Sequence, residues 1–154
     1  MEEKIREDEG LFPGISLDNH SVTNRPDLFR MNFIIQAGPK HLIRNEQAGD
    51  WHYWPTGCHA LVDNSLTADS QLAVAVHELV EAYLCKKAGI TDEAVCAFDK
   101  KYEAERKKGK HGEQDEPGDD PRSPYREQHM AATHVERAVC AAIGLNWKEH
   151  CDAI

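Results

Sequence analysis

Hydrophobic and polar positions change their spacing along the chain, and three short segments in its first half are typical of strands. Residues 31–36, 50–54 and 59–62 are apolar or alternating runs, each followed by turn-forming residues. We expect them to form a small antiparallel sheet. Residues 1–30 contain charged and turn-rich pieces without a sustained period, which indicates an N-terminal extension that is partly mobile. A single domain is expected over residues 31–154.

Three helices are predicted in the second half of the chain. Thr67 can cap the first helix, which ends before Gly89, and Thr91 can cap the second. The third helix spans roughly residues 125–143 and is closed by Gly144. The fold class that follows is α+β, with the small antiparallel sheet packed on three helices.

The first predicted helix carries a polar island in an otherwise apolar stretch. His77 and Glu81 lie one helical turn apart, and Glu78 lies beside them on the same face. An isolated buried charge costs several kcal/mol, so these groups need partners, and a divalent metal would partner two of them at once. The alternative is a buried His77–Glu81 hydrogen bond, or a helix edge that faces solvent.

The third predicted helix offers a further ligand. His129 and Glu136 are polar members of a mostly apolar stripe, whereas His134 lies about 140° away around the helix. We therefore predict His129 as the third metal ligand, with Glu136 as a ligand or as a residue that orients one. The metal site would then lie between the first and the last helix. The alternative is that His129 is an ordinary residue near a helix start.

A long loop precedes that helix. Residues 107–124 contain three Gly, three Pro and five acidic residues, and loops of this length are usually functional lids or disordered insertions. Asp119 and Asp120 can supply or orient a metal ligand, although acidic runs more often form a solvated face.

The polar island resembles the HExxH helix of zinc metallohydrolases, the zincins. The stretch is His77-Glu78-Leu79-Val80-Glu81, so Glu81 replaces the second histidine. Carboxylate is a competent zinc ligand, and an added carboxylate also admits manganese or iron. The resemblance implies that His77 and Glu81 bind the metal and that Glu78 is the catalytic general base, which activates a metal-bound water.

The chain is also similar to a family of small proteins of phages, prophages and bacteria that resemble minimal zincins. The segments that carry this likeness are LAVAVHELVEAYLCKKAGI, AFDKKYE and EPGDDPRSPYREQH, and the likeness covers about residues 50–147. It implies a zinc-dependent metallohydrolase, peptidase-like in its chemistry, and brings no particular substrate with it.

Composition narrows the list of partners. The chain of 154 residues has 27 acidic and 18 basic residues and a net charge of −9, which argues against nucleic acid and anionic membranes as partners. No apolar run approaches the roughly 18 residues of a membrane helix, and the first ten residues are too charged for a secretory leader. Five cysteines without a CxxC pair do not suggest a disulfide framework. We expect a cytoplasmic protein.

The sequence is compatible with three functional hypotheses. The leading hypothesis is a metal-dependent hydrolase acting on a peptide or another small substrate. The second is a non-enzymatic binding or inhibitor protein of phage type, with a structural metal or no metal and a protein partner. The third is a nucleotide pyrophosphatase that holds magnesium through Glu78 and Glu81, but no ExxD motif follows, since Glu93 and Asp99 are six residues apart.

Overall fold

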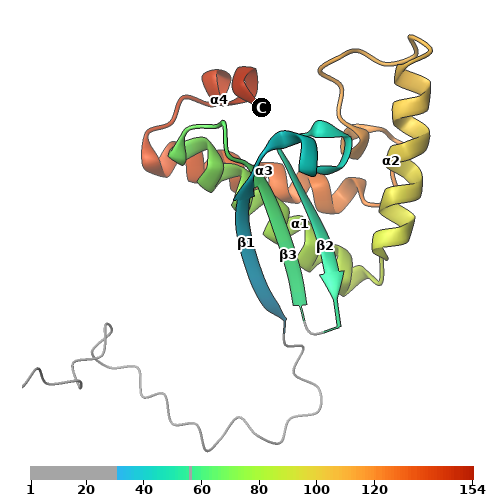
Figure 1. The fold of residues 1–154 in the computed structure, drawn as a ribbon, viewed down its shortest axis with the longest axis horizontal. Coiled ribbons are helices and arrows are strands. Elements are labelled where there is room, and N and C mark those ends of the chain that lie inside the picture. The colour runs from blue at the N-terminus through green and yellow to red at the C-terminus, as the bar shows by residue number, and fades with distance from the viewer. Residues whose placement is uncertain (1–30, 56) are drawn as a thin grey trace, which may run out of the picture.

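The computed structural model describes residues 31–55 and 57–154, so the predicted extension over residues 1–30 lies outside the described part. The elements follow in the order β1 (Asn32–Gly38), β2 (Gly49–Trp54), β3 (Gly57–Asp63), α1 (Ala68–Ala88), α2 (Asp92–Arg106), α3 (Arg126–Ile143) and α4 (Trp147–Ala153), with short 3-10 turns at η1 (Lys40–Leu42), η2 (Arg44–Glu46) and η3 (Pro117–Asp119) (Figure 1). The predicted α+β class is confirmed, as are the three predicted strands and three predicted helices.

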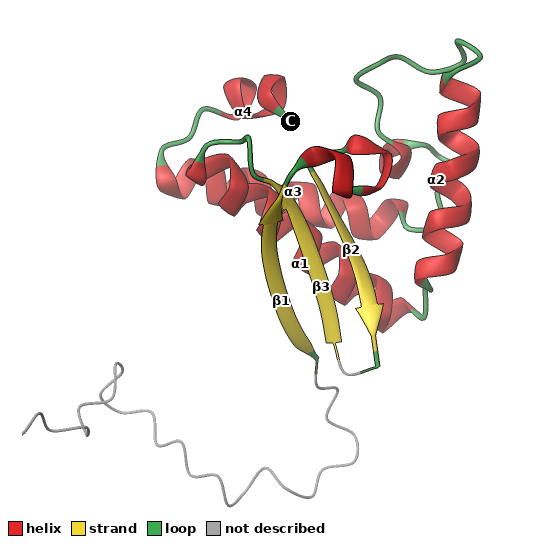
Figure 2. Cartoon of the chain, viewed as in Figure 1, coloured by secondary structure: helices red, strands yellow, loops and turns green. Residues whose placement is uncertain are grey.

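The prediction of an antiparallel sheet is wrong, because the sheet is mixed. Its strand order is β1-β3-β2, with β2 antiparallel to β3 and β1 parallel to β3 (Figure 2). The chain reverses direction between β1 and β2 and again in the tight hairpin between β2 and β3. β3 therefore runs in the same direction as β1 and takes the central position between the two other strands.

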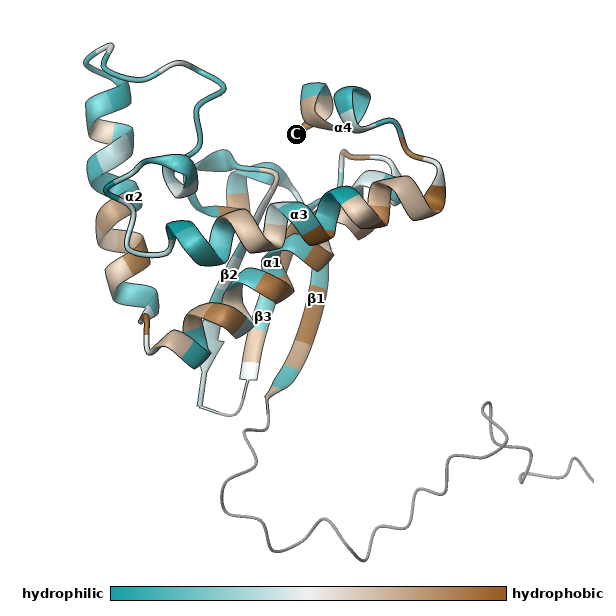
Figure 3. Ribbon diagram, turned by 180° about the vertical axis from the view of Figure 1, so that it is seen from behind, coloured by the Kyte–Doolittle hydropathy of each residue, from teal (hydrophilic) through white to brown (hydrophobic). Residues whose placement is uncertain are grey.

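α1 lies between the sheet and α3, which explains why it is apolar on most sides. Seen from behind the sheet, α1 and α3 lie next to each other (Figure 3), and α1 packs on the strands. The helix ends are those that the sequence predicts. The Thr67 side chain accepts a hydrogen bond from the Ser70 backbone N–H, and Gly89 closes the helix with a left-handed φ of 72°. A helix buried on two sides can carry polar side chains only where other groups satisfy them.

The strand β2 presents alternate residues to the two faces of the sheet. Trp51 is 1% exposed and packs in the core against α1, and the Tyr53 hydroxyl donates to the Ala82 carbonyl oxygen at 2.7 Å. On the opposite face, the rings of His52 and Trp54 both contact His59. β2 thus places an indole N–H beside the polar island of α1.

A fourth helix, α4, follows the helix that the sequence predicts as the last one. Asn146 caps it by accepting from the Glu149 backbone N–H at 3.1 Å. The sequence prediction of three helices is therefore incomplete, and the polar group described below lies between the first and third helices, not between the first and last. None of the helices in the described part of the chain is long and apolar enough to cross a membrane.

Candidate metal centre

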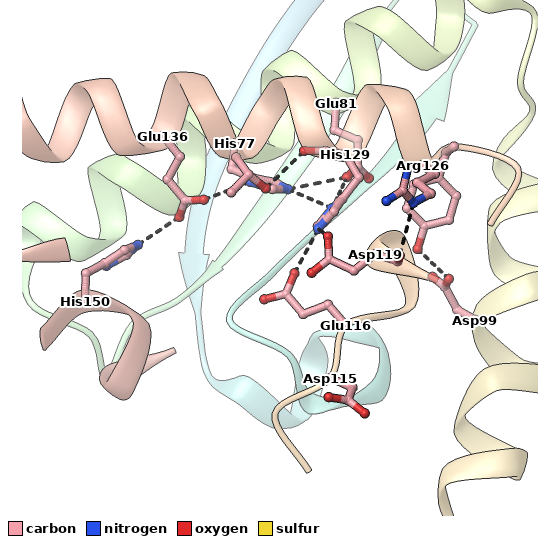
Figure 4. A network of polar contacts seen from close by, with 12 residues as sticks. His77, Glu81, Asp99, Asp115, Glu116, Asp119, Arg126, His129, Glu136 and His150 are labelled. Carbon is pink, nitrogen blue, oxygen red and sulfur yellow. Dashed lines mark hydrogen bonds and ion pairs between the residues drawn. The ribbon is translucent and has the colours of Figure 1, made fainter. Parts of the chain in front are cut away.

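Three side chains from α1 and α3 converge on one point. The Nε2 atom of His77 lies 3.4 Å from Oε2 of Glu81 and 3.3 Å from Nδ1 of His129, and the last two atoms are 2.8 Å apart (Figure 4). The i, i+4 spacing on α1 supplies the first two side chains, and the first turn of α3 supplies the third. Within the described part of the chain, these residues form the group whose side-chain atoms lie close enough together to hold a metal ion. We call it the His77–Glu81–His129 triad.

Each member of the triad has an orienting partner on its other polar atom. Three contacts provide this: His77 Nδ1 lies 2.9 Å from Glu136 Oε2, His129 Nε2 lies 3.0 Å from Glu116 Oε2, and Trp51 Nε1 donates to Glu81 Oε1 at 2.8 Å. Such outer partners fix the ring orientation and the tautomer of metal-binding histidines in known sites. Here they come from α3, from the loop before it and from β2.

These outer contacts determine where the protons lie. A carboxylate can only accept, so a histidine that carries a single proton would direct its N–H at its outer glutamate, His77 from Nδ1 and His129 from Nε2. In that form the lone pairs of the inner nitrogen atoms face each other and Glu81 Oε2. Three acceptors buried together repel one another unless a cation stands between them, and all three residues are at most 8% exposed.

The size of the triad fits a divalent metal. A tetrahedral zinc ion with ligands at about 2.0–2.1 Å sets neighbouring donor atoms about 3.3 Å apart. Two edges of the triad, at 3.3 and 3.4 Å, already match this spacing, and the third, at 2.8 Å, has the length of a hydrogen bond. A shift of about 0.5 Å along that edge would accommodate the ion.

Without a metal, protons take the place of the cation. Burial alone would lower the pKa of His129, but its hydrogen bonds with Glu116 and Glu81 raise it to about 9. Burial likewise opposes the charged form of His77, yet contacts with Glu136 and Glu81 raise its pKa well above the usual value. Burial would raise the pKa of Glu81, but hydrogen bonds from His129 and His77 lower it to about 2. The site is thus built to hold positive charge.

Glu78, the predicted general base, lies beside the triad and faces β2. A Cβ atom added to Gly49 would collide with Oε1 of Glu78, which shows how closely this carboxyl group approaches the strand. Burial raises its pKa well above the ordinary value; the charge of His77 lowers it, whereas those of Glu81 and Asp50 raise it further. Glu78 is therefore a more basic carboxylate than a solvated one.

The loop before α3 reaches the triad through two of its acidic residues. Glu116 contacts His129 directly, and Oδ1 of the predicted Asp119 lies 3.7 Å from His129 Nε2. The predicted Asp120 instead pairs with Arg122 at 2.7 Å, away from the triad. His134 is exposed on α3, as its place on the helix predicts.

Arginine side chains fasten this loop to α2. Arg106 donates to the backbone carbonyl oxygens of Gly112, Glu113 and Asp115, and Arg122 pairs with Glu105 at 2.9 Å. These contacts fix the position of the acidic residues in the loop, which the sequence of the loop alone does not predict.

Sequence reasoning missed four members of the network. Two of them had a local signal: Trp51 lies on the core face of an alternating strand, and Asn146 followed by Glu149 marks the start of the helix that carries His150. No pattern distinguishes Glu116 from the other acids of its loop. Ser70, which contacts His150, is an ordinary first-turn residue of α1.

In comparisons with known proteins, no family, no curated protein and no solved structure matches this chain. No family is identified for the chain.

The raised pKa of His129 predicts how the stability of the metal-free protein depends on pH. A histidine whose pKa rises on folding stabilises fully below its unfolded pKa of 6.5, and this contribution is lost as the pH rises through the folded value of about 9. We expect the free energy of unfolding in chelator to fall by on the order of 3 kcal/mol between these pH values. Urea titrations of the wild type and His129→Gln measure it. A wild-type profile no steeper than that of the variant would contradict the assignment.

Gly118 leaves room for the His129 ring, which predicts a second effect. A Cβ atom at this position would overlap the ring of His129, so Gly118→Ala should displace the ligand and weaken zinc binding by at least about tenfold. The matched control is Gly38→Ala, because a Cβ there meets no atom within 4 Å. Competition with a chromophoric chelator measures both affinities, and equal affinities would show that His129 is not a ligand.

Proposed function

We propose that this protein is a metal-dependent hydrolase whose metal is held by His77, Glu81 and His129. The observation that carries the proposal is the triad of buried inward acceptors, each fixed from outside by its own partner. A buried hydrogen-bonded pair would need no third acceptor. Two nitrogen donors and one carboxylate favour zinc, with manganese or iron as alternatives.

The number of ligands supports catalysis over a purely structural role. Structural zinc sites are usually closed by four protein ligands, whereas catalytic sites use three and keep one position for water or substrate. Within residues 31–55 and 57–154, the group has three members. A binding protein with a structural metal would call for a fourth ligand.

Its position next to His77 in the sequence and its raised pKa support Glu78 as the general base. A divalent metal in the triad would act as a Lewis acid toward a carbonyl group and would lower the pKa of water. Glu78, one residue after His77, would accept the proton of the attacking water on its carboxylate. In the metal-free protein burial raises the pKa of Glu78, which moves its proton affinity toward neutral pH, where general bases are most effective.

The site favours neutral carbonyl substrates over phosphate esters. Glu116 and Asp119 lie beside His129 with side chains 49% and 66% exposed, so the solvent side of the triad is acidic. These carboxylates would repel an anionic substrate, whereas a peptide bond carries no charge. We therefore propose a peptidase-like reaction.

The test combines metal content with hydrolysis. Elemental analysis should find about one zinc per chain in the wild type and in Glu78→Gln, and much less in His77→Ala. With fluorescein-labelled casein and quenched peptide mixtures as probes, the wild type should show zinc-dependent cleavage. Glu78→Gln should cleave at least about 100-fold more slowly, because it keeps the ligands and loses the proton acceptor.

Glu93→Gln is the matched control, since Glu93 is exposed on α2, away from the triad. It should keep both zinc and turnover. Wild-type turnover in Glu78→Gln would exclude the proposed base. A wild type that takes up no zinc would remove the metal centre, and a zinc-loaded protein that cleaves none of the probes would favour the binding-protein alternative.

A further inference from the structure

His150 is the most deeply buried polar residue of the C-terminal helix and extends the network of the triad to a fourth element. It is 0% exposed and is the buried residue of α4, whose other side chains are partly or fully exposed. Its Nε2 atom lies 2.8 Å from Oε1 of Glu136 (Figure 4), and its Nδ1 atom lies 3.1 Å from the Ser70 hydroxyl. A short helix that docks through a buried imidazole depends on those hydrogen bonds, because either nitrogen left unpaired would be costly.

The partners of each polar atom indicate which atoms donate and which accept in this series of contacts. The Glu136 carboxylate accepts from His150 at one oxygen and from His77 at the other, so His150 carries its N–H on Nε2. The Nδ1 atom of His150 is then an acceptor, and the Ser70 hydroxyl donates to it. Ser70, His150, Glu136 and His77 thus form a continuous series of contacts. The series ends at His77 Nε2, which faces Glu81 and His129.

This arrangement leaves Glu136 with one orientation. Its two oxygens contact two histidines, one from α1 and one from α4. Glu136 is buried, with only 4% of its surface exposed. If the α4 histidine were absent, Oε1 would lose its donor and the carboxylate could rotate away from His77. The imidazole of His77 would then lose the contact that aims Nε2 at the metal.

We propose that His150 is a positioning residue for the metal site, and that docking of α4 and metal binding stabilise each other. The inference rests on the proposed metal centre, which it extends to an element that supplies no ligand. If α4 docking strengthens zinc binding, zinc must strengthen α4 docking by the same factor, since coupling between two equilibria is reciprocal. Ile154, the residue after α4, also packs against the core cluster that contains Val62 and Val74. The docking of α4 therefore does not depend on His150 alone.

Zinc affinity of His150 variants is the first part of the test. Competition with a chromophoric chelator should give a 10- to 100-fold weaker affinity for His150→Phe, which fills the space without a donor. His150→Gln keeps an N–H donor and should recover most of the affinity. His134→Phe, the same change at an exposed position of α3, should bind zinc as the wild type does.

Hydrogen exchange of the wild type is the second part and needs no variant to fold. Zinc should slow amide exchange in residues 148–153 several-fold in the wild type, and this effect should vanish in Glu136→Gln. A merely structural histidine would not make exchange in α4 depend on zinc. Zinc-independent exchange in α4, or a folded His150→Phe with wild-type affinity, would overturn the proposal.

The outcomes separate the two proposals. If the wild type binds zinc and His77→Ala does not, the metal centre stands whatever His150 does, and only the positioning role is at stake. If the wild type binds no zinc, the metal centre fails and the positioning role fails with it.

Discussion

Three buried polar atoms facing one another between two helices are the constraint on which this structure depends. His77, Glu81 and His129 each direct one polar atom at a common point, and each has its other polar atom in contact with an outer partner. Such a cluster is stable only around positive charge. In the metal-free protein protons supply that charge, because contacts with the neighbouring glutamates raise the pKa values of both histidines. A divalent metal would supply it without titrating.

The outer partners spread this constraint over the domain. Trp51 brings in the edge strand β2, Glu116 brings in the loop that arginines fasten to α2, and Glu136 brings in α3 and, through His150, α4. α1 carries two members of the triad and is enclosed by the sheet on one side and by α3 on the other. In this small fold, the helices α1 to α4 and the strand β2 contact the triad directly, through one of its partners or through the loop that carries Glu116.

The sequence predicts the parts of this site that depend on local spacing. Helical period places His77 and Glu81 on one face, and the apolar stripe of the third helix selects His129, so all three were accessible without a structure. The mixed sheet was not, because the choice of edge at which β1 joins β3 depends on contacts distant in sequence. Glu116 and His150 were not either, because tertiary contacts of a loop and of a short terminal helix bring them to the site.

The most direct measurement is a crystal structure of the zinc-loaded protein with anomalous data collected at the zinc edge. We expect one strong anomalous peak at about 2.0–2.2 Å from His77 Nε2, His129 Nδ1 and a Glu81 oxygen. Glu116 and Glu136 should still accept hydrogen bonds from the outer nitrogen atoms of the two histidines. Saturating zinc with no peak in the triad, and His129 still bonded directly to Glu81, would contradict it.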